Sequence, residues 1–146
     1  MLFLRHASAD KRLPSPTADR ARRLARAGRS DARRLPAALE HHEIDRIVSS
    51  PHARCLETVA PLARSRGIEI EYRDELAPDA TRRSTLALLA TLPESAIVCT
   101  HREVVEKLQV RLTVSIGAVP MAVPHTRPVM VTNHATDPDL LIQENI

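Results

Sequence analysis

Met1-Leu2-Phe3-Leu4-Arg5-His6 is an apolar run that ends abruptly in an arginine and a histidine. The run has the length and composition of a short buried strand, which places its last two residues at the strand's carboxyl end. In open α/β sheets, ligands bind in the crevice beyond the carboxyl ends of the strands. Arg5 and His6 are therefore candidate site residues, although a strand that simply runs into a polar turn would look the same by itself.

The length and composition of the chain predict one globular domain. The chain has 146 residues, which fits a single domain over residues 1–146. Hydrophobic residues make up 43% and charged residues 27%, so we expect neither a disordered nor a membrane-embedded chain. With one Phe, one Tyr and no Trp, the sequence lacks the aromatic rings on which single-stranded nucleic acids stack.

Positive charge is carried almost entirely by arginine. The formal net charge is +3, and Lys11 and Lys107 are the only lysines. Because the planar guanidinium group matches a phosphate with two parallel hydrogen bonds, this bias favours a phosphate-bearing ligand. The basic residues are interleaved with Asp and Glu along the predicted helices and form no single basic run, which argues against a nucleic-acid partner.

The cysteines and the apolar runs indicate the compartment. Cys55 and Cys99 are far apart and match no metal-ligand or redox spacing, as is typical of a reduced cytoplasmic protein. We expect Cys99 to be a small buried apolar residue that affects a nearby site only when it is oxidised. The N-terminus does not resemble a signal peptide, and no apolar run approaches the roughly 18 residues of a membrane span. We therefore expect no membrane partner.

The first half of the chain has the pattern of a βαβ unit. A helical pattern before residue 40 is followed by a predicted strand over residues 46–49. Ser50 is a candidate helix cap, because Pro51 is well suited to the first position of a helix. That helix should continue to Gly67, and it carries Arg54 in its first turn.

The second half repeats the alternation of strand and helix. We predict an edge strand over residues 68–72, an amphipathic helix over residues 81–92 and a buried strand over residues 96–99. Thr100 and Glu103 have the spacing of a capping box, which places His101 at the first helical residue of a helix that runs to about residue 112. Short strands should follow at residues 119–123, 128–132 and 140–143. This order predicts a three-layer α/β/α sandwich with a mainly parallel central sheet.

Three predicted strand ends present basic groups at equivalent positions. Arg5 and His6 follow the first strand, Arg54 lies just inside the next helix, and His101 lies at a later strand-to-helix junction. Carboxyl ends of parallel strands meet at one edge of the sheet, so these side chains should converge. Two histidines, two arginines and the free N–H groups of helix starts would suit a tetrahedral phosphate.

Four segments carry a family resemblance. They are Leu4-Arg5-His6-Ala7, Arg22-Arg23-Leu24-Ala25-Arg26-Ala27-Gly28, Ser50-Pro51-His52-Ala53-Arg54-Cys55-Leu56-Glu57-Thr58 and Thr100-His101. In this order they resemble the successive signatures of the histidine phosphatase (phosphoglycerate mutase-like) superfamily. The resemblance extends over roughly residues 1–110 and implies a phosphoglycerate mutase-like fold and a metal-independent phosphatase.

Within the superfamily, the short chain is similar to bacterial phosphohistidine phosphatases of the SixA type. It also looks like the phosphatase-like domain attached to some actinobacterial Nudix hydrolases. Three positions depart from the usual pattern: Ala7 replaces Gly, Ala25 replaces Thr and Glu57 replaces the frequent Gln. None of these departures removes a charged group of the predicted site.

The resemblance implies a mechanism with a covalent intermediate. His6 would attack phosphorus and become transiently phosphorylated, and water would then release phosphate. Arg5, Arg54 and His101 would neutralise the phosphoryl oxygens, and His101 would belong to the catalytic set. No metal or other cofactor is implied. Arg22 is a weaker candidate, as an outer contact to the substrate.

The acid that many superfamily members supply for the leaving group has no clear counterpart. The relevant segment reads Asp74-Glu75-Leu76-Ala77-Pro78-Asp79, so Pro78 stands where the family has Glu. Glu75 and Asp79 are possible substitutes, although carboxylates in loops are usually solvated. Without an acid, the expected substrates have leaving groups that depart readily: phosphohistidine on a protein, or a small phosphorylated metabolite or nucleotide such as a diphosphate.

Other nucleophiles, metal sites and functions are less consistent with the sequence. A cysteine phosphatase needs Arg six positions after its nucleophile, but Pro61 and Val105 occupy those positions. The remaining histidines have no zinc-ligand spacing and are expected at the surface: His41, His42, His52, His125 and His134. A phosphate-binding regulatory module without turnover is the rival from another functional class, and assay of a His6→Ala variant separates it from an enzyme.

Overall fold

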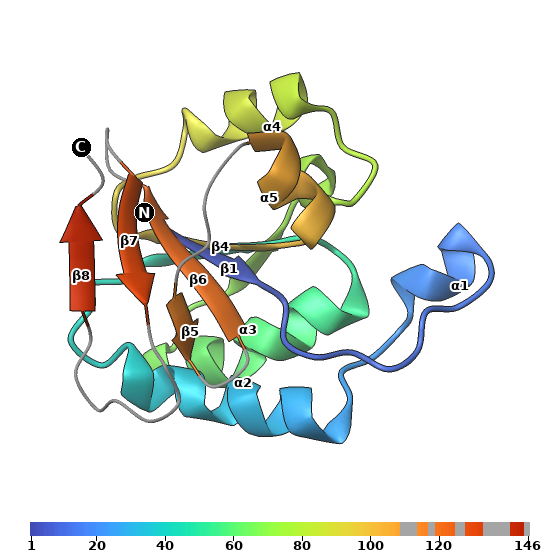
Figure 1. Ribbon diagram of the computed structural model, residues 1–146, viewed down its shortest axis with the longest axis horizontal. Coiled ribbons are helices and arrows are strands. Elements are labelled where there is room, and N and C mark those ends of the chain that lie inside the picture. The colour runs from blue at the N-terminus through green and yellow to red at the C-terminus, as the bar shows by residue number, and fades with distance from the viewer. Residues whose placement is uncertain (109–113, 117–118, 125–127, 133–140, 145–146) are drawn as a thin grey trace.

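A parallel four-stranded sheet forms the centre of the structure (Figure 1). The computed structural model describes residues 1–108, 114–116, 119–124, 128–132 and 141–144. The parallel strands lie in the order β3 (Ile70–Tyr72), β2 (Arg46–Ser49), β4 (Ala96–Thr100) and β1 (Leu2–Arg5). The predicted edge position of the strand near residue 70 is thus confirmed.

The C-terminal strands extend this sheet with antiparallel pairing. Strand β6 (Val119–Pro124) lies next to β1, and β7 (Pro128–Thr132) and β8 (Leu141–Glu144) follow it. Strand β5 (Val114–Ile116), which the sequence did not predict, pairs with β6. The predicted helical residues 109–112 and the predicted strand residue 140 lie outside the described residues.

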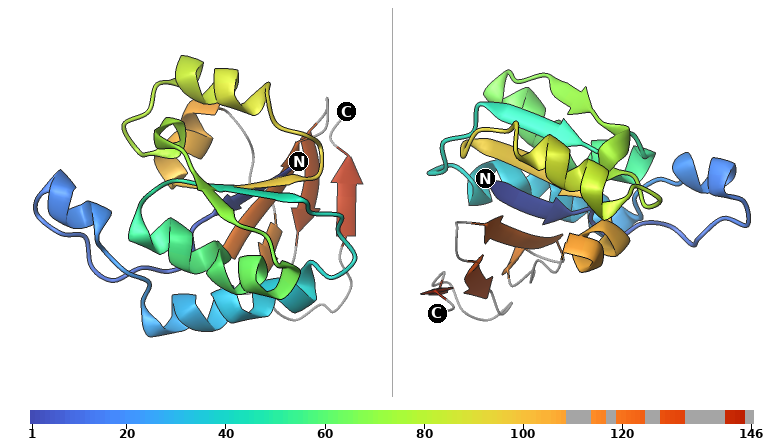
Figure 2. Two further views of the ribbon diagram at one scale, coloured as in Figure 1. Left: turned by 180° about the vertical axis from the view of Figure 1, so that it is seen from behind. Right: turned by 90° about the horizontal axis from the view of Figure 1, so that it is seen from above.

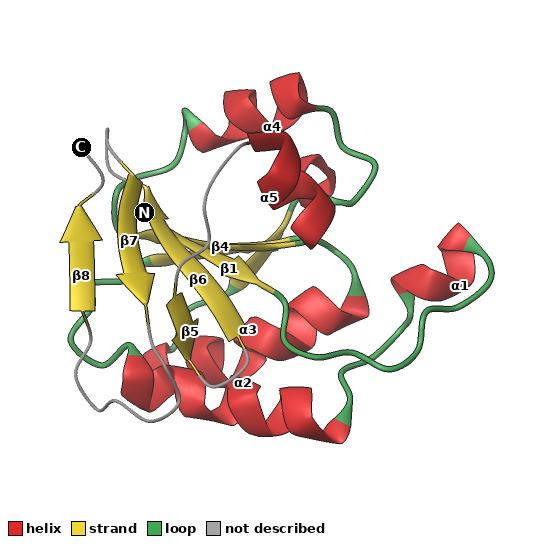
Figure 3. Ribbon diagram, in the orientation of Figure 1, coloured by secondary structure: helices red, strands yellow, loops and turns green. Residues whose placement is uncertain are grey.

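Helices cover both faces of the parallel strands (Figures 1 and 3). Helices α2 (Arg26–Ala38) and α3 (Ala53–Arg66) lie on one face, and α4 (Arg82–Leu89) and α5 (Arg102–Leu108) lie on the other. Seen from behind, the sheet again lies between the two helical layers, and seen from above its strands lie side by side (Figure 2). The predicted α/β/α sandwich is confirmed. No helix in the described part of the chain is long and apolar enough to span a membrane.

Alternating side chains of the strands build two separate cores. Leu2 and Leu4 pack with α2 and α3, whereas Phe3 between them faces α4 and α5. Strand β4 alternates in the same way, with Ile97 on the first side and Val98 on the second. Because both faces of the strands are buried, their sequences are continuous apolar runs, and this is why they could be recognised.

Two helices begin later than the sequence predicted. Helix α3 begins at Ala53 with His52 in the capping position, so the prediction of Ser50 as the cap was wrong. Helix α5 begins at Arg102, because Thr100 is still the last residue of β4 and its hydroxyl donates to the carbonyl of Leu76 at 2.7 Å. The predicted capping box at Thr100 was therefore wrong as well. Helix α4 is shorter than predicted.

Residues 8–25 form an excursion that leaves the sheet after β1 and carries helix α1 (Pro16–Arg20) away from the body (Figure 1). The two arms of the excursion are joined by backbone hydrogen bonds and by an isolated β-bridge between Ala9 and Leu24. Gly28 lies against the base of the excursion, where an added Cβ would come within 2.0 Å of the carbonyl oxygen of Ser8. The absence of a side chain at Gly28 therefore allows the two segments to approach.

Candidate active site

The register of the parallel strands brings the ends of β1, β2 and β4 together. Arg5 is the partner of Thr100 across β1 and β4, and the backbone N–H of His6 donates to the Thr100 carbonyl at 3.0 Å. On the other side of β4, the N–H of Ser50 donates to the Cys99 carbonyl at 2.9 Å. The residues that follow these strands therefore meet at one edge of the sheet, as the sequence predicted.

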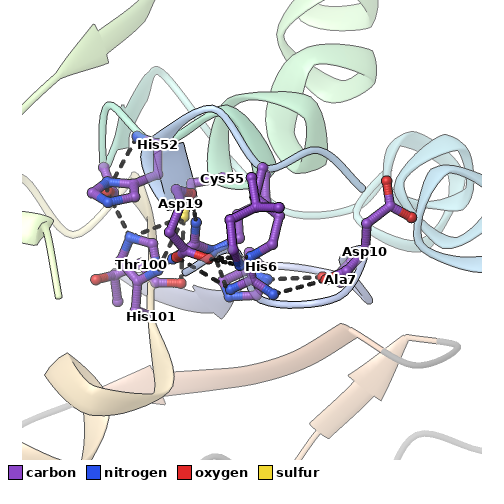
Figure 4. A network of polar contacts seen from close by, with 12 residues as sticks. His6, Ala7, Asp10, Asp19, His52, Cys55, Thr100 and His101 are labelled. Atoms are coloured by element: carbon purple, nitrogen blue, oxygen red, sulfur yellow. Dashed lines mark hydrogen bonds and ion pairs between the residues drawn. The ribbon is translucent and has the colours of Figure 1, made fainter. Parts of the chain in front are cut away.

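The predicted histidines His6 and His101 lie in one network of polar contacts (Figure 4), and Arg54 contacts both of them. Its guanidinium group is almost fully buried, with 3% of the residue exposed. Nε donates to Nε2 of His6 at 3.3 Å, Nη2 lies 3.2 Å from Nδ1 of His101, and Nη1 donates to the backbone carbonyl of Asp19 at 2.8 Å. One cation thus touches both imidazole rings, whose centroids are 5.4 Å apart.

The hydrogen bonds of His6 fix its tautomer. Nδ1 lies 2.8 Å from the carbonyl oxygen of Ala7, and because a carbonyl can only accept, Nδ1 carries the proton. Nε2 therefore keeps its lone pair and faces Arg54. Burial is the main cause that lowers the pKa of His6 from 6.5 to about 4, and the charges of Arg54 and Arg5 add to it. His6 is thus a neutral imidazole at neutral pH.

His101 is completely buried next to this ring. Its Nε2 lies 2.7 Å from the hydroxyl oxygen of Ser50, and its Nδ1 faces Arg54. Burial and the charge of Arg54 lower the pKa of His101 far below its usual value. Both histidines are therefore uncharged, while the surrounding arginines supply the positive charge.

Asp19 is a residue of this cluster that the sequence analysis missed. It is 7% exposed, and its carboxylate lies 3.2 Å from Nη2 of Arg54 and 2.8 Å from Nε of Arg22. Burial alone would raise the pKa of Asp19, but the N–H of Leu13 and the two arginine charges outweigh it and lower the pKa. A carboxylate in a loop gives no sequence signal by itself, and only its place before the Arg22–Gly28 segment could have pointed to it.

Arg5 and Arg22 lie at the border of the cluster. The Nε atom of Arg5 is buried and has no hydrogen-bond partner among the described residues, which leaves a donor available at the end of β1. Arg22 is held by Asp19 and by the backbone carbonyl of Asp10, to which Nη1 donates at 2.9 Å. Its charge contributes to the lowered pKa of His6, so Arg22 lies near the cluster while its side chain is tied down by the excursion.

A cleft of about 1100 Å³ opens beside the cluster, between the excursion and the segment that follows β3. Asp19 and His52 line it on the side of the cluster, and both predicted acid candidates, Glu75 and Asp79, line it as well. Glu75 accepts a hydrogen bond from Arg73 at 2.8 Å, and this bond lowers the pKa of Glu75. Glu75 is therefore an ionised carboxylate, which is a poor proton donor.

The burial of the cysteines agrees with the sequence analysis, whereas the burial of one histidine does not. Cys99 is fully buried, as expected, and burial raises the pKa of its thiol. Cys55 is also buried, and its Sγ lies 3.5 Å from Nε2 of His101. His52 is only 8% exposed, so the expectation that it lies at the surface was wrong. Within the described residues, no group of three His, Cys, Asp or Glu side chains could hold a metal ion.

Known proteins share this architecture. Residues 1–78 match the model of the histidine phosphatase superfamily, branch 1. The candidate phosphohistidine phosphatase SixA of Agrobacterium tumefaciens is 31% identical, with a TM-score of 0.63 over 74% of this chain and 72% of that one. The corresponding candidate SixA from Nakamurella multipartitia is 26% identical, with a TM-score of 0.56 over 73% and 62%. A SixA protein histidine phosphatase in complex with tungstate is 21% identical, with a TM-score of 0.65 over 90% and 89%, and it shares the fold.

No curated protein matches the chain in sequence. The family model nevertheless extends over more than half of the 146 residues, and it includes the segments that supply Arg5, His6, Asp19 and Arg54. The Agrobacterium protein supports the same assignment over most of both chains. The chain belongs to the histidine phosphatase superfamily, branch 1.

Proposed function

We propose that this protein is a metal-independent phosphatase in which His6 forms a phosphohistidine intermediate. The observation that carries the proposal is the hydrogen bonding of His6: Nδ1–H donates to the Ala7 carbonyl, so Nε2 keeps its lone pair, which in the free protein accepts a long hydrogen bond from the buried guanidinium of Arg54. A neutral imidazole in this state is a competent nucleophile at neutral pH. We also propose that residues 1–146 act as one phosphatase domain.

In the first step, the lone pair of Nε2 of His6 forms a bond to phosphorus. The bond between phosphorus and the leaving group breaks, and the leaving group takes the electron pair. In the second step, water attacks phosphorus, the P–N bond breaks, and its electrons return to Nε2. The proton that water loses goes to the released phosphate or to solvent. The two displacements replace one more difficult step.

We assign to three groups the stabilisation of the charge that develops on the phosphoryl oxygens. Arg54 supplies a buried guanidinium that already touches both histidines, and Nε of Arg5 supplies a donor without a partner in the described part of the chain. His101 supplies a ring nitrogen, Nδ1, on the same side. In phosphoryl transfer, such preorganised donors and charges provide most of the catalysis.

The leaving group determines which phosphorylated compounds are good substrates. Pro78 replaces the expected acid, and Glu75 is ion-paired with Arg73. We therefore propose a substrate whose leaving group needs little protonation: phosphohistidine on a protein, or the terminal phosphate of a small metabolite or nucleotide. The similarity to two candidate phosphohistidine phosphatases makes the first class the stronger candidate.

Release of phosphate from phosphohistidine and from an activated aryl phosphate tests the proposal. His6→Ala should abolish turnover, whereas His41→Ala should not, because the His41 side chain is 91% exposed. Vanadate should inhibit, since it mimics five-coordinate phosphorus, and a chelator should have no effect. Turnover by His6→Ala would refute the mechanism. Phosphate binding without turnover in the wild type would instead identify a regulatory phosphate-binding module.

A second experiment tests the absence of an acid. A general acid typically contributes about 10²- to 10⁴-fold, so kcat/KM should fall by that order as the pKa of the leaving group rises across a series of esters. Glu75→Gln and Asp79→Asn should leave this dependence unchanged. A flat dependence that becomes steep in either variant would show that the carboxylate concerned serves as the acid.

A further inference from the structure

His52 is joined to the buried end of the site by a chain of hydrogen bonds. The Ser50 hydroxyl oxygen lies 2.7 Å from Nε2 of His101 and 3.2 Å from Nδ1 of His52, and Ser50 is itself fully buried. The rings of His52 and His101 pack edge to face with centroids 4.7 Å apart (Figure 4). The far side of this chain reaches the cleft, because His52 is among the residues that line it.

The donors and acceptors in this chain are fixed from one end. A guanidinium can only donate, so Nδ1 of His101 accepts from Arg54 and its proton lies on Nε2. Nε2–H then donates to Ser50, and the single hydroxyl proton of Ser50 is left to donate to Nδ1 of His52. The proton of neutral His52 therefore lies on Nε2.

A bound phosphoryl group reverses these requirements. Its oxygens accept hydrogen bonds, and in the proposed complex Arg54 donates to them instead of to Nδ1 of His101. His101 can then hold a phosphoryl oxygen itself only if Nδ1 carries the proton. Because burial keeps His101 neutral, its Nε2 must then accept from Ser50, and the Ser50 oxygen must accept from Nδ1–H of His52. The reversal takes up one proton at Nδ1 of His101 and releases one from Nε2 of His52, so the total number of protons and the charge stay the same.

We propose that His52 is a positioning residue that, through the Ser50 hydroxyl, switches Nδ1 of His101 from acceptor to donor when a phosphoryl group binds. The role of His101 as a phosphoryl-oxygen donor rests on the proposed function. His52 itself does not contact the ligand in this proposal. It lies at the end of the hydrogen-bond chain that reaches the cleft, and there its Nε2 releases a proton to solvent.

The surroundings of His52 keep it neutral, as the chain requires. Burial lowers the pKa of His52, and the charges of Arg54 and Arg20 lower it further, whereas Asp19 and Asp79 act in the opposite direction. A permanently cationic His52 would carry protons on both nitrogens, and Ser50 could no longer donate to it. Neutral His52 can carry its proton on either ring nitrogen, and the proposed switch needs both tautomers.

Two substitutions separate positioning from packing. His52→Phe keeps a ring of similar size but removes the hydrogen bond, so kcat should fall about tenfold with little change in KM. His52→Asn places an amide oxygen or nitrogen near the position of Nδ1, and either can face Ser50 after a flip, so kcat should stay within about threefold of the wild type. Equal activity in wild type and His52→Phe, or an equal loss in both variants, would overturn the proposal.

A double variant of Ser50 and His52 provides a further control, because it shows whether the effects of the two substitutions on kcat are additive. Because His52 acts through Ser50, Ser50→Ala combined with His52→Phe should be no slower than Ser50→Ala alone. Additive losses would contradict a shared chain. If the wild type binds phosphate without turnover, the kinetic experiments no longer apply, and the tautomer of His101 is measured directly as follows.

Imidazole ¹⁵N NMR of the wild-type protein, titrated with orthovanadate, reports which nitrogen of His101 is protonated. We expect the proton on Nε2 in the free protein and on Nδ1 in the complex, and we expect His52→Phe to prevent or weaken this exchange. A complex in which His101 stays protonated on Nε2 would overturn the proposal. Since this titration uses the wild type, it remains decisive even if a variant fails to fold.

Discussion

Because the fold holds His6 neutral, the stability of the protein should depend on pH. The substitution His6→Gln should remove this part of the pH dependence. The unfolded chain binds a proton at His6 with a pKa near 6.5, whereas the folded protein holds that pKa at about 4. Between these values the unfolded state carries more protons, so stability rises with pH across this window. The contribution of neutral His6 to the free energy of unfolding is fully present above pH 6.5 and is lost as the pH falls toward 4.

The size of the effect follows from the two pKa values. The gap between 6.5 and about 4 corresponds to about 3 kcal/mol of stability, which is lost in full once the pH is below both values. Between pH 7 and pH 5 the part lost is about 2 kcal/mol. In His6→Gln the titrating group is absent, so this part of the loss should disappear.

The assay is denaturant unfolding of wild type and His6→Gln at pH 7 and pH 5, in buffers free of phosphate. The fall in unfolding free energy between the two pH values should be about 2 kcal/mol smaller in His6→Gln than in the wild type. His41→Gln, which removes an exposed imidazole, should behave like the wild type. Equal losses in wild type and His6→Gln would refute the conclusion that the fold holds His6 neutral.

Three further substitutions test the contacts that hold the site. Asp19→Asn removes the carboxylate charge that two guanidinium groups share, and denaturant titration should show a loss of about 3 kcal/mol. Thr58→Val removes the hydroxyl that accepts from the N–H of Ala7 at 3.0 Å and should cost about 1 to 3 kcal/mol, whereas Thr58→Ser should cost less. Gly28→Ala forces a Cβ against the carbonyl of Ser8, and Tm should fall by about 5 °C or more. An unchanged midpoint in any of these variants contradicts the contact concerned.

The sequence predicted the sheet and its basic edge because both depend on local patterns. Strands buried on two faces are short apolar runs, and such runs are visible around Phe3, Val48 and Val98. Once parallel strands are assigned, their carboxyl ends must meet, so the meeting of His6, Arg54 and His101 follows from topology alone. The positions of the strands and of these three residues could therefore be predicted without any knowledge of side-chain contacts.

What the sequence did not predict depends on competition between contacts distant in the chain. Ser50 has the composition of a helix cap, but its hydroxyl bonds to His101 across the sheet edge, and the helix begins later. His52 looks like a surface histidine, yet it is buried and its Nδ1 lies 3.2 Å from the same Ser50 hydroxyl. Asp19 reaches Arg54 only because the excursion folds back over the end of β1. Local propensity cannot express such long-range pairings.

The electrostatic design of the site connects these observations with the proposed chemistry. Arg54 is buried and has Asp19 as its carboxylate partner, while Arg22 shares that same carboxylate. The excess positive charge helps to lower the pKa values of His6 and His101, and in the proposed function it also attracts a phosphoryl dianion. When the dianion binds, it compensates these charges and, on the proposed switch, accepts a hydrogen bond from Nδ1–H of a His101 that stays neutral. On this proposal, the arginines that keep the nucleophile neutral in the free protein also delay the donor function of His101 until a phosphoryl group is present.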